Sequence, residues 1–253
     1  MIAPLSRCLT PTFAVEEVPD LAFAESRTSA GQVEALALDV YLPANDPATL
    51  RPAVLWFHGG GFAPGNDRKQ IYIPRLARAF AARGLVGIAP DYRVRANGAE
   101  DWPGTVRDAV EDGRKALEWV RANHLAYRID PNQIVLAGGS AGGMLACNLA
   151  ALERTGALAL VNLWGPPLPV MRIFDALEPG FPPIFIAHGT ADQLVPYAVS
   201  EAFVQEAAQA GVPYALMTLP GEPHTPLHRL EDIIGRVARF LARRQAPWAG
   251  ELV

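Results

Sequence analysis

The stretch QIVLAGGSAGGMLACNLAALE, residues 133–153, decides the fold because it joins a strand pattern to a helix pattern through a glycine-rich turn. Residues 133–137 are almost continuously apolar, which is typical of a strand buried on both faces of a parallel sheet. Ser140 follows between Gly138 and Gly142, in the pattern G-x-S-x-G. Glycine at these two positions lets the strand and the helix approach without a Cβ clash. The stretch therefore predicts a sharp turn that exposes Ser140 at the end of a strand.

The same alternation of strand and helix patterns extends along most of the chain. Short apolar runs are followed by longer stretches with apolar residues at helical spacing, which predicts the α/β class with a mostly parallel sheet and helices on both faces. Residues 33–43 alternate in polarity and are predicted to form an antiparallel strand at the sheet edge. The other predicted strands are 53–57, 85–89, 133–137, 158–164, 183–187 and 214–219, and the predicted helices are 72–83, 104–123, 141–153, 197–210 and 227–243.

Length and composition favour one domain. The chain has 253 residues, of which 50% are hydrophobic, enough for one substantial core. We expect residues 1–253 to form a single domain, with residues 1–30 as an N-terminal extension or part of a cap. The two cysteines form no C-x-x-C pair and belong to no cluster of metal-type ligands. Neither a disulfide framework nor a metal site is therefore expected.

Charge and hydropathy patterning argue against several classes of partner. The formal net charge is -4 and no basic run stands out, so nucleic acid is not an expected partner. No stretch approaches the roughly 20 apolar residues that span a bilayer, and prolines and acids interrupt residues 1–20. We therefore expect a cytoplasmic protein that does not bind membranes. The sequence does not indicate an oligomeric state.

A second glycine-rich turn follows the predicted strand that ends at residue 57. This turn, HGGGF (58–62), exposes backbone N–H groups without side-chain cover. The N–H groups of Gly60, Gly61 and Ala141 are predicted to form an oxyanion hole. A flexible loop is the alternative, and the spacing excludes a G-x-G-x-x-G dinucleotide fingerprint. His58 is interpreted as a residue that holds the loop in shape.

Two later loops at the same sheet edge carry an acid and a base. Asp192 and His224 each follow a predicted strand, and their order after Ser140 is serine, acid, histidine. A serine hydroxyl is a poor nucleophile until an imidazole accepts its proton, and a carboxylate orients that imidazole. These three residues are therefore predicted to form a catalytic triad.

Alternatives remain open for each member of this triad. The serine turn could be an ordinary capped loop, and Asp192 could only cap its own turn. His188 and His228 compete with His224 as the base, although His228 falls in a predicted helix and His188 at a strand end. Glu222 is the alternative acid, but it lies only two residues from His224.

At this point the chain resembles the esterase branch of the α/β-hydrolases that carries an HGGG oxyanion loop. This branch includes the carboxylesterases and the compact acetyl or feruloyl esterases. The resemblance runs from about Val33 to Phe240. It implies hydrolysis through a covalent acyl-serine intermediate, with no metal or organic cofactor. It is carried by HGGGF (58–62), PDYR (90–93), IDPNQIVLAGGSAGG (129–143), HGTADQLVP (188–196) and GEPH (221–224).

Two departures from the larger lipases in this branch bear on the substrate. Gly139 stands where those lipases usually carry an acidic residue, and only 192 − 140 = 52 positions separate the predicted nucleophile from the acid. The cap is therefore predicted to be reduced, and the chain resembles the compact esterases more closely. A short lid favours short acyl esters over long triacylglycerols.

The segment 164–181 is rich in proline and apolar residues, and it is predicted either to form an apolar wall beside the nucleophile or only to cover the sheet. Amide hydrolysis of the exopeptidase or arylformamidase type, acyl transfer, and a non-catalytic binding protein with this fold remain alternatives. The candidate substrate-binding residues are Phe62, Trp102, Trp164, Leu168, Met171 and Val195.

Overall fold

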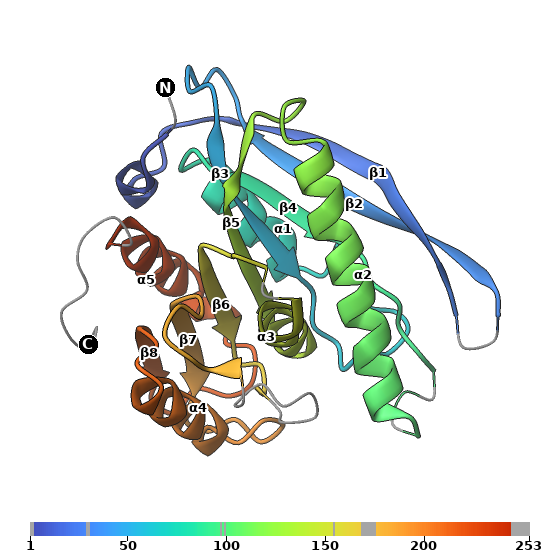
Figure 1. The fold of residues 1–253 in the computed structure, drawn as a ribbon. Coiled ribbons are helices and arrows are strands. Elements are labelled where there is room, and N and C mark those ends of the chain that lie inside the picture. Colours follow the sequence, from blue (N-terminus) through green and yellow to red (C-terminus); the bar gives the residue numbers. More distant parts are fainter. Residues whose placement is uncertain are drawn as a thin grey trace.

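The protein is described by a computed structural model that covers residues 3–28, 31–96, 98, 100–153, 155–167 and 176–243. Its centre is an eight-stranded sheet (Figure 1). In sheet order the strands are β1 (Val15–Arg27), β2 (Val33–Pro43), β4 (Val86–Pro90), β3 (Arg51–Phe57), β5 (Ile129–Gly139), β6 (Ala159–Leu163), β7 (Ile184–Gly189) and β8 (Tyr214–Leu219). All neighbouring strands from β4 to β8 pair in parallel, whereas β1, β2 and β4 pair antiparallel.

Helices cover both faces of this sheet, as the sequence predicted. Strand β3 requires cover on both faces, because all seven of its residues are buried and their side chains alternate between the two faces. Leu55 and Phe57 pack into the core under α2, α3 and α4, whereas Val54 and Trp56 pack under α1, α5 and η1. The helices are η1 (Leu5–Leu9), α1 (Tyr72–Ala81), α2 (Trp102–Ala122), α3 (Ala141–Glu153), α4 (Ala198–Gln209), η4 (Leu227–Arg229) and α5 (Leu230–Ala242).

The prediction that residues 33–43 form the edge strand is wrong, although their antiparallel pairing is confirmed. The edge strand is β1, and β2 lies between β1 and β4. Two register shifts interrupt the β1 ladder, and Asp20 has a left-handed φ of 58°. These irregularities break the period-two pattern by which a strand is recognised in a sequence. Pro19 also lies in β1, where an edge strand tolerates the missing N–H.

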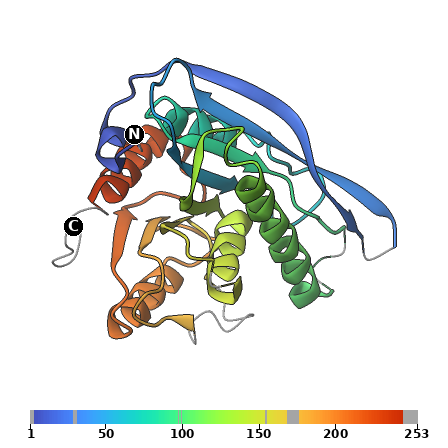
Figure 2. The same cartoon turned by 45° about the horizontal axis from the view of Figure 1, so that its top comes forward.

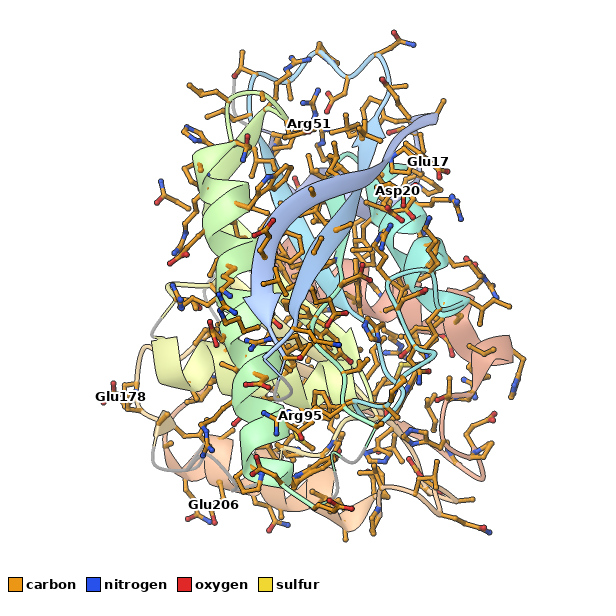
Figure 3. The ribbon with its side chains drawn as sticks, turned by 90° about the vertical axis from the view of Figure 1, so that its right-hand side faces the viewer. Glu17, Asp20, Arg51, Arg95, Glu178 and Glu206 are labelled. Atoms are coloured by element: carbon orange, nitrogen blue, oxygen red, sulfur yellow. The ribbon has the colours of Figure 1, made fainter. Side chains whose placement is uncertain are left out.

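Ion pairs fix the outer strand to the rest of the molecule. Glu17 of β1 receives hydrogen bonds from Arg78 of α1, the shorter at 2.5 Å, and Asp20 pairs with Lys69 at 2.8 Å. Figure 3 labels Glu17 and Asp20 on this side of the molecule, where β1 crosses in front of α1. The helix η1, which precedes β1 in the chain, lies against α5, the last helix (Figure 2). Among the described residues, no helix has both the length and the apolarity to cross a membrane.

Candidate active site

Ser140 occupies a strained turn between β5 and α3. Its φ is 55°, a left-handed value that costs a residue other than glycine about 1 to 3 kcal/mol. The Ser140 N–H donates to the carbonyl oxygen of Leu163 in the neighbouring strand at 2.9 Å, which helps to hold this conformation. The predicted order of strand, sharp turn and helix is confirmed, with β5 ending at Gly139 and α3 beginning at Ala141.

The glycines around this turn are required by close packing. A Cβ atom at Gly138 would collide with the backbone of Gly142. A Cβ atom at Gly142 would in turn collide with the carbonyl oxygens of Phe57 and His58, where β3 ends. The close approach that the sequence pattern predicted is therefore present in the structure.

Three side chains from three different strand ends form one hydrogen-bonded chain. His224 Nε2 lies 3.0 Å from Ser140 Oγ, and His224 Nδ1 lies 2.7 Å from Asp192 Oδ2. Because an ionised carboxylate only accepts hydrogen bonds, Nδ1 carries the proton of the neutral imidazole and Nε2 can accept from the serine hydroxyl. This is the geometry needed to activate a serine nucleophile.

Asp192 is held as an anion by the groups around it. Its Oδ1 accepts from the backbone N–H groups of Leu194 at 2.8 Å and Val195 at 2.9 Å. Burial raises the pKa of Asp192, but the hydrogen bonds from Val195, His224 and Leu194 outweigh it and keep the pKa below its usual value. The carboxylate therefore stays charged where it meets the imidazole.

His188 is the other candidate base that lies near this chain of hydrogen bonds. It contacts Asp192, and in this chain only Asp192 and His224 connect it to Ser140. Its Nε2 lies 3.0 Å from both Asp192 Oδ2 and the Val195 carbonyl oxygen, and its Nδ1 lies 2.6 Å from Ser200 Oγ. Two acceptors at Nε2 require the proton there, so Nδ1 accepts from the Ser200 hydroxyl. His188 therefore contacts the acid, whereas His224 contacts the serine.

His228 and Glu222, the other candidates for the base and the acid, contact each other. His228 Nε2 lies 3.0 Å from Glu222 Oε1, and 67% of the His228 side chain is exposed. Arg229 approaches the same carboxylate oxygen at 3.5 Å. This cluster bonds neither Ser140 nor Asp192 within the described part of the chain.

The predicted oxyanion loop runs directly beside the nucleophile. A Cβ atom at Gly59 would lie 3.2 Å from the Ser140 Cβ atom, so the two backbones are in contact. Gly60 and Gly61 have left-handed φ values of 98° and 61°, and within the described residues their N–H groups meet no acceptor. Ala141 is the first residue of α3 and has one of the N–H groups that a helix leaves without an internal partner. The loop can thus offer donors to a developing oxyanion.

Buried polar contacts fix the start of this loop. His58 donates from Nδ1 to the Gly59 carbonyl oxygen at 2.8 Å and stacks on Tyr92, with ring centroids 4.0 Å apart. Burial lowers the pKa of His58, so its imidazole is neutral. The Tyr92 hydroxyl donates to the His58 carbonyl oxygen at 2.7 Å, and the Gly59 N–H donates to Gln70 Oε1 at 2.8 Å. These contacts agree with a structural role for His58.

Tyr92 and Gln70 were not recognised as site residues from the sequence. The motif PDYR contains Tyr92, but nothing in the motif indicates that the tyrosine contacts a loop more than 30 residues earlier. Gln70 lies in a stretch without any motif. Only the packing of the two loops shows that both residues support the nucleophile's surroundings.

The candidate substrate-binding residues have different environments. Phe62 and Trp164 are fully buried, so they can support a substrate pocket only from behind. Trp102 is partly buried and packs edge-on against Phe62, with ring centroids 5.5 Å apart, and Val195 is partly exposed beside Asp192. Leu168 and Met171 lie outside the described residues.

Comparisons with known sequences agree with this geometry. A family model described as BD-FAE matches residues 38–160, and one described as the prolyl oligopeptidase family matches residues 173–245. The chain is 28% identical over 249 residues to a protein of Oryza sativa subsp. japonica named "Probable isoprenylcysteine alpha-carbonyl methylesterase". That match covers 78% of this chain and 56% of the relative, so the chain spans just over half of the relative's length.

Comparisons with solved structures extend over nearly the whole chain. A thermophilic esterase from Thermogutta terrifontis matches with a TM-score of 0.71 and 26% identity, covering 95% of this chain and 96% of the esterase. A truncated carbohydrate esterase from gut microbiota matches with a TM-score of 0.73 and 19% identity, covering 94% and 98% of the two chains, and supports the fold alone. Together the comparisons confirm the predicted α/β-hydrolase fold and the resemblance to serine esterases.

Proposed function

We propose that this chain, which has the α/β-hydrolase fold and is similar in sequence and structure to serine esterases, hydrolyses carboxylic esters. The observation that carries the proposal is the continuous hydrogen-bonded chain from Ser140 Oγ through His224 to Asp192. Each of the three residues lies at the carboxyl end of a strand of one sheet, so the sheet fixes their relative positions.

The first half of the proposed reaction forms an acyl-enzyme. Ser140 Oγ attacks the ester carbonyl carbon while His224 Nε2 accepts the hydroxyl proton. The carbonyl oxygen becomes an oxyanion, toward which the N–H groups of Gly60, Gly61 and Ala141 donate. When the tetrahedral intermediate collapses, the bond to the alkoxy oxygen breaks and the imidazolium returns the proton to the leaving alcohol.

The second half regenerates the enzyme. Water takes the place of the alcohol, and His224 accepts one of its protons as its oxygen attacks the acyl carbon. Collapse of this second intermediate breaks the bond to Ser140 Oγ, which recovers a proton from the imidazolium, and releases the carboxylic acid. Asp192 stays ionised throughout, because its hydrogen bonds hold its pKa below the usual value.

Short acyl groups are the proposed substrate class. The esterase from Thermogutta terrifontis has been solved with propionate and with butyrate bound, and it is 26% identical to this chain in both forms. The short chain segment between the nucleophile and the acid supports the same preference. We propose that Trp102 and Val195 border the acyl group. A cytoplasmic location stays a prediction from the sequence, which cell fractionation tests.

Amide hydrolysis is the second candidate, and one observation favours it. The prolyl oligopeptidase family model matches residues 173–245, which include both Asp192 and His224. The same nucleophile, base and acid could attack an amide carbonyl. Matched nitrophenyl ester and nitroanilide substrates with the same acyl group distinguish the two activities, and faster turnover of the anilide would favour amide hydrolysis.

Replacement of the nucleophile tests the proposal directly. We expect Ser140→Ala to lower the turnover of nitrophenyl acetate and butyrate on the order of 10⁴-fold or more, because no other group supplies the attacking oxygen. A fluorophosphonate probe should label the parent chain and leave the variant unlabelled. Ser6→Ala, at an exposed serine in η1, is the matched control and should behave like the parent. Unchanged turnover in a folded Ser140→Ala variant would refute the proposal.

A further inference from the structure

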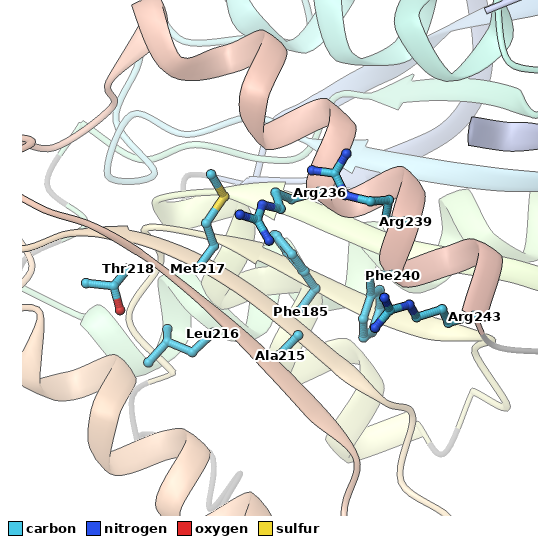
Figure 4. A pocket seen from close by; sticks show the side chains of 9 residues that line it. All are labelled: Phe185, Ala215, Leu216, Met217, Thr218, Arg236, Arg239, Phe240 and Arg243. Atoms are coloured by element: carbon cyan, nitrogen blue, oxygen red, sulfur yellow. The ribbon is translucent and has the colours of Figure 1, made fainter. Parts of the chain in front are cut away.

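A second recess lies beside β8, the final strand of the sheet. A pocket of about 280 Å³ opens between β8 and α5, and no member of the Ser140, Asp192 and His224 set lines it (Figure 4). Since β8 is the last strand in the sheet order, this pocket occupies the edge of the sheet. It is therefore separate from the candidate active site.

The floor of this pocket is apolar. Phe185 of β7 and Phe240 of α5 pack with their ring centroids 5.6 Å apart, and both are almost completely buried. Met217 of β8 is only partly buried and also lines the pocket. The partly exposed Met217 side chain can therefore contact an apolar ligand in the recess.

The rim of the pocket is basic. Arg236, Arg239 and Arg243 line it from α5 and the residue that follows, at spacings of three and four that put them on one helix face. All three are exposed, and within the described residues none of their guanidinium groups forms an ion pair or a hydrogen bond. No Asp or Glu of the described ranges lines the pocket. The three positive charges therefore have no partner in that part of the chain.

Charged residues at the start of the same helix do have partners. Arg229, just before α5, pairs with Asp232 at 2.5 Å, and Glu231 of α5 pairs with Arg75 of α1 at 3.6 Å. The net charge of the chain is -4, so acidic groups are not scarce. A cluster of guanidinium groups above an apolar floor favours an occupant that is anionic at one end and apolar at the other.

Charge also argues against a second copy of this chain as the occupant. Two copies paired about a two-fold axis at the β8 edge would bring their arginine clusters toward each other, and like charges across an interface are unfavourable. The volume instead suits a small molecule. At about 30 Å³ for each water-sized group, 280 Å³ accommodates roughly nine such groups.

We propose that this pocket binds a short amphiphilic carboxylate, with a carbon chain of about six atoms, at a site separate from Ser140. The carboxylate contacts the guanidinium groups of Arg236 and Arg239, and the alkyl chain covers Met217. Carboxylic acids are also the product class of the proposed ester hydrolysis. Only this link to the product rests on the proposed function, because the binding itself requires no catalysis.

Isothermal titration calorimetry with sodium hexanoate tests the proposal on the full chain. We expect measurable binding to the parent chain, weakened about tenfold or more when Arg236, Arg239 and Arg243 are all replaced by Gln, because each guanidinium supplies charge-assisted hydrogen bonds. Arg107→Gln, at an exposed arginine of α2, is the matched control and should keep the parent affinity. Binding should weaken as NaCl is raised.

A second variant and a neutral ligand distinguish binding in this pocket from binding elsewhere on the chain. Met217→Glu adds a carboxylate beside the arginines and should abolish hexanoate binding, and 1-hexanol should bind much more weakly than hexanoate. Thermal unfolding checks that each variant is folded. Equal affinity in the parent and the triple variant, equal binding of hexanol, or no heat from the parent would each overturn the proposal.

Sedimentation and hydrolysis complete the test. Dimers of the parent that the triple variant no longer forms would identify a second copy as the occupant and overturn the proposal. Nitrophenyl acetate turnover should be similar in the parent and the triple variant. If the parent lacks turnover but binds hexanoate through the arginines, the proposed function fails while the pocket's ligand class stands.

Discussion

Asp192 shows how much of the candidate site depends on hydrogen bonds around one carboxylate. Two backbone N–H groups donate to Oδ1, while His224 and His188 both lie within 3.0 Å of Oδ2. The two histidines differ in what their other nitrogen meets. His224 faces the Ser140 hydroxyl, and His188 accepts from Ser200. His224 is therefore placed to accept the Ser140 proton, and His188 to orient the Asp192 carboxylate.

His188 is expected to act on the rate through Asp192. We expect His188→Ala to lower kcat roughly 10- to 100-fold with little change in KM, because a misplaced acid no longer orients the base. With one donor fewer, Asp192 should attract the His224 proton more strongly, so the acidic limb of the kcat/KM profile should move to higher pH. Steady-state kinetics across pH on nitrophenyl acetate measures both effects.

Two controls separate this role from a loss of structure. His188→Gln retains an N–H donor at the end of the side chain and should recover part of kcat. His228→Ala removes an exposed histidine and should leave kcat within about twofold of the parent, as expected for a surface change. A His188→Ala variant with normal kcat and an unmoved profile would show that the contact to Asp192 has no effect on the reaction.

At the scale of elements, the position of α3 against β3 decides whether the nucleophile's turn can form. Gly142 lies in the first turn of α3, where any Cβ atom would meet the carbonyl oxygens at the end of β3. The same contact brings the HGGGF loop beside Ser140. The glycine pattern in the sequence therefore reflects the packing of this helix against the strand.

A pair of glycine substitutions tests this packing. We expect Gly142→Ala to destabilise the fold by about 3 kcal/mol or more and to abolish activity, because the clash is with backbone and cannot be relieved by a rotamer change. Gly235→Ala, inside α5, meets only the flexible Arg239 side chain at 3.7 Å and should stabilise the fold by about 0.5 to 1 kcal/mol. Urea unfolding measures both; equal stability changes would contradict the packing argument.

At the scale of the whole molecule, the start of the chain is tied to segments far along it. Cys8 Sγ of η1 donates to the Ala238 carbonyl oxygen of α5 at 3.2 Å. Asp46 joins Arg7 of η1 to Arg51 at the start of β3, with 2.6 Å between the Arg51 Nε and Asp46 Oδ2 atoms. These contacts close the face of the sheet that α1 and α5 cover.

Asp46 should make stability depend on pH under acidic conditions. Burial raises the pKa of Asp46, but hydrogen bonds from Arg7, the Ala48 N–H and Arg51 outweigh it and hold the pKa at about 2. An unfolded aspartate titrates near 3.9, so the stabilisation is fully present above about pH 4 and is lost as pH falls through the folded pKa.

The substitution Asp46→Asn isolates this contribution. We expect it to lower the free energy of unfolding by about 3 kcal/mol at pH 6, since it leaves the buried Arg51 without its anion. The difference from the parent should shrink between about pH 4 and pH 2. Glu206→Gln, at an exposed carboxylate of α4 (Figure 3), should show no such trend. A pH-independent difference in urea unfolding would refute the linkage.

The sequence by itself determined the fold class and the positions of most strands and helices, because buried parallel strands and their covering helices have strong local patterns. It also predicted that Ser140, Asp192 and His224 lie close together, since each follows a recognisable strand and the carboxyl ends of parallel strands share one sheet edge. Motif order along the chain was sufficient for these predictions.

Only the tertiary structure decided which distant groups touch. β1 was not recognised as the edge strand, because its register shifts remove the local alternation and only its pairing with β2 defines it. The contact of His188 with the acid, and of Tyr92 with the HGGGF loop, likewise depends on how separate loops meet at the sheet edge. Local spacing carries information about near neighbours along the chain, whereas these contacts are set by strand order and by packing between elements.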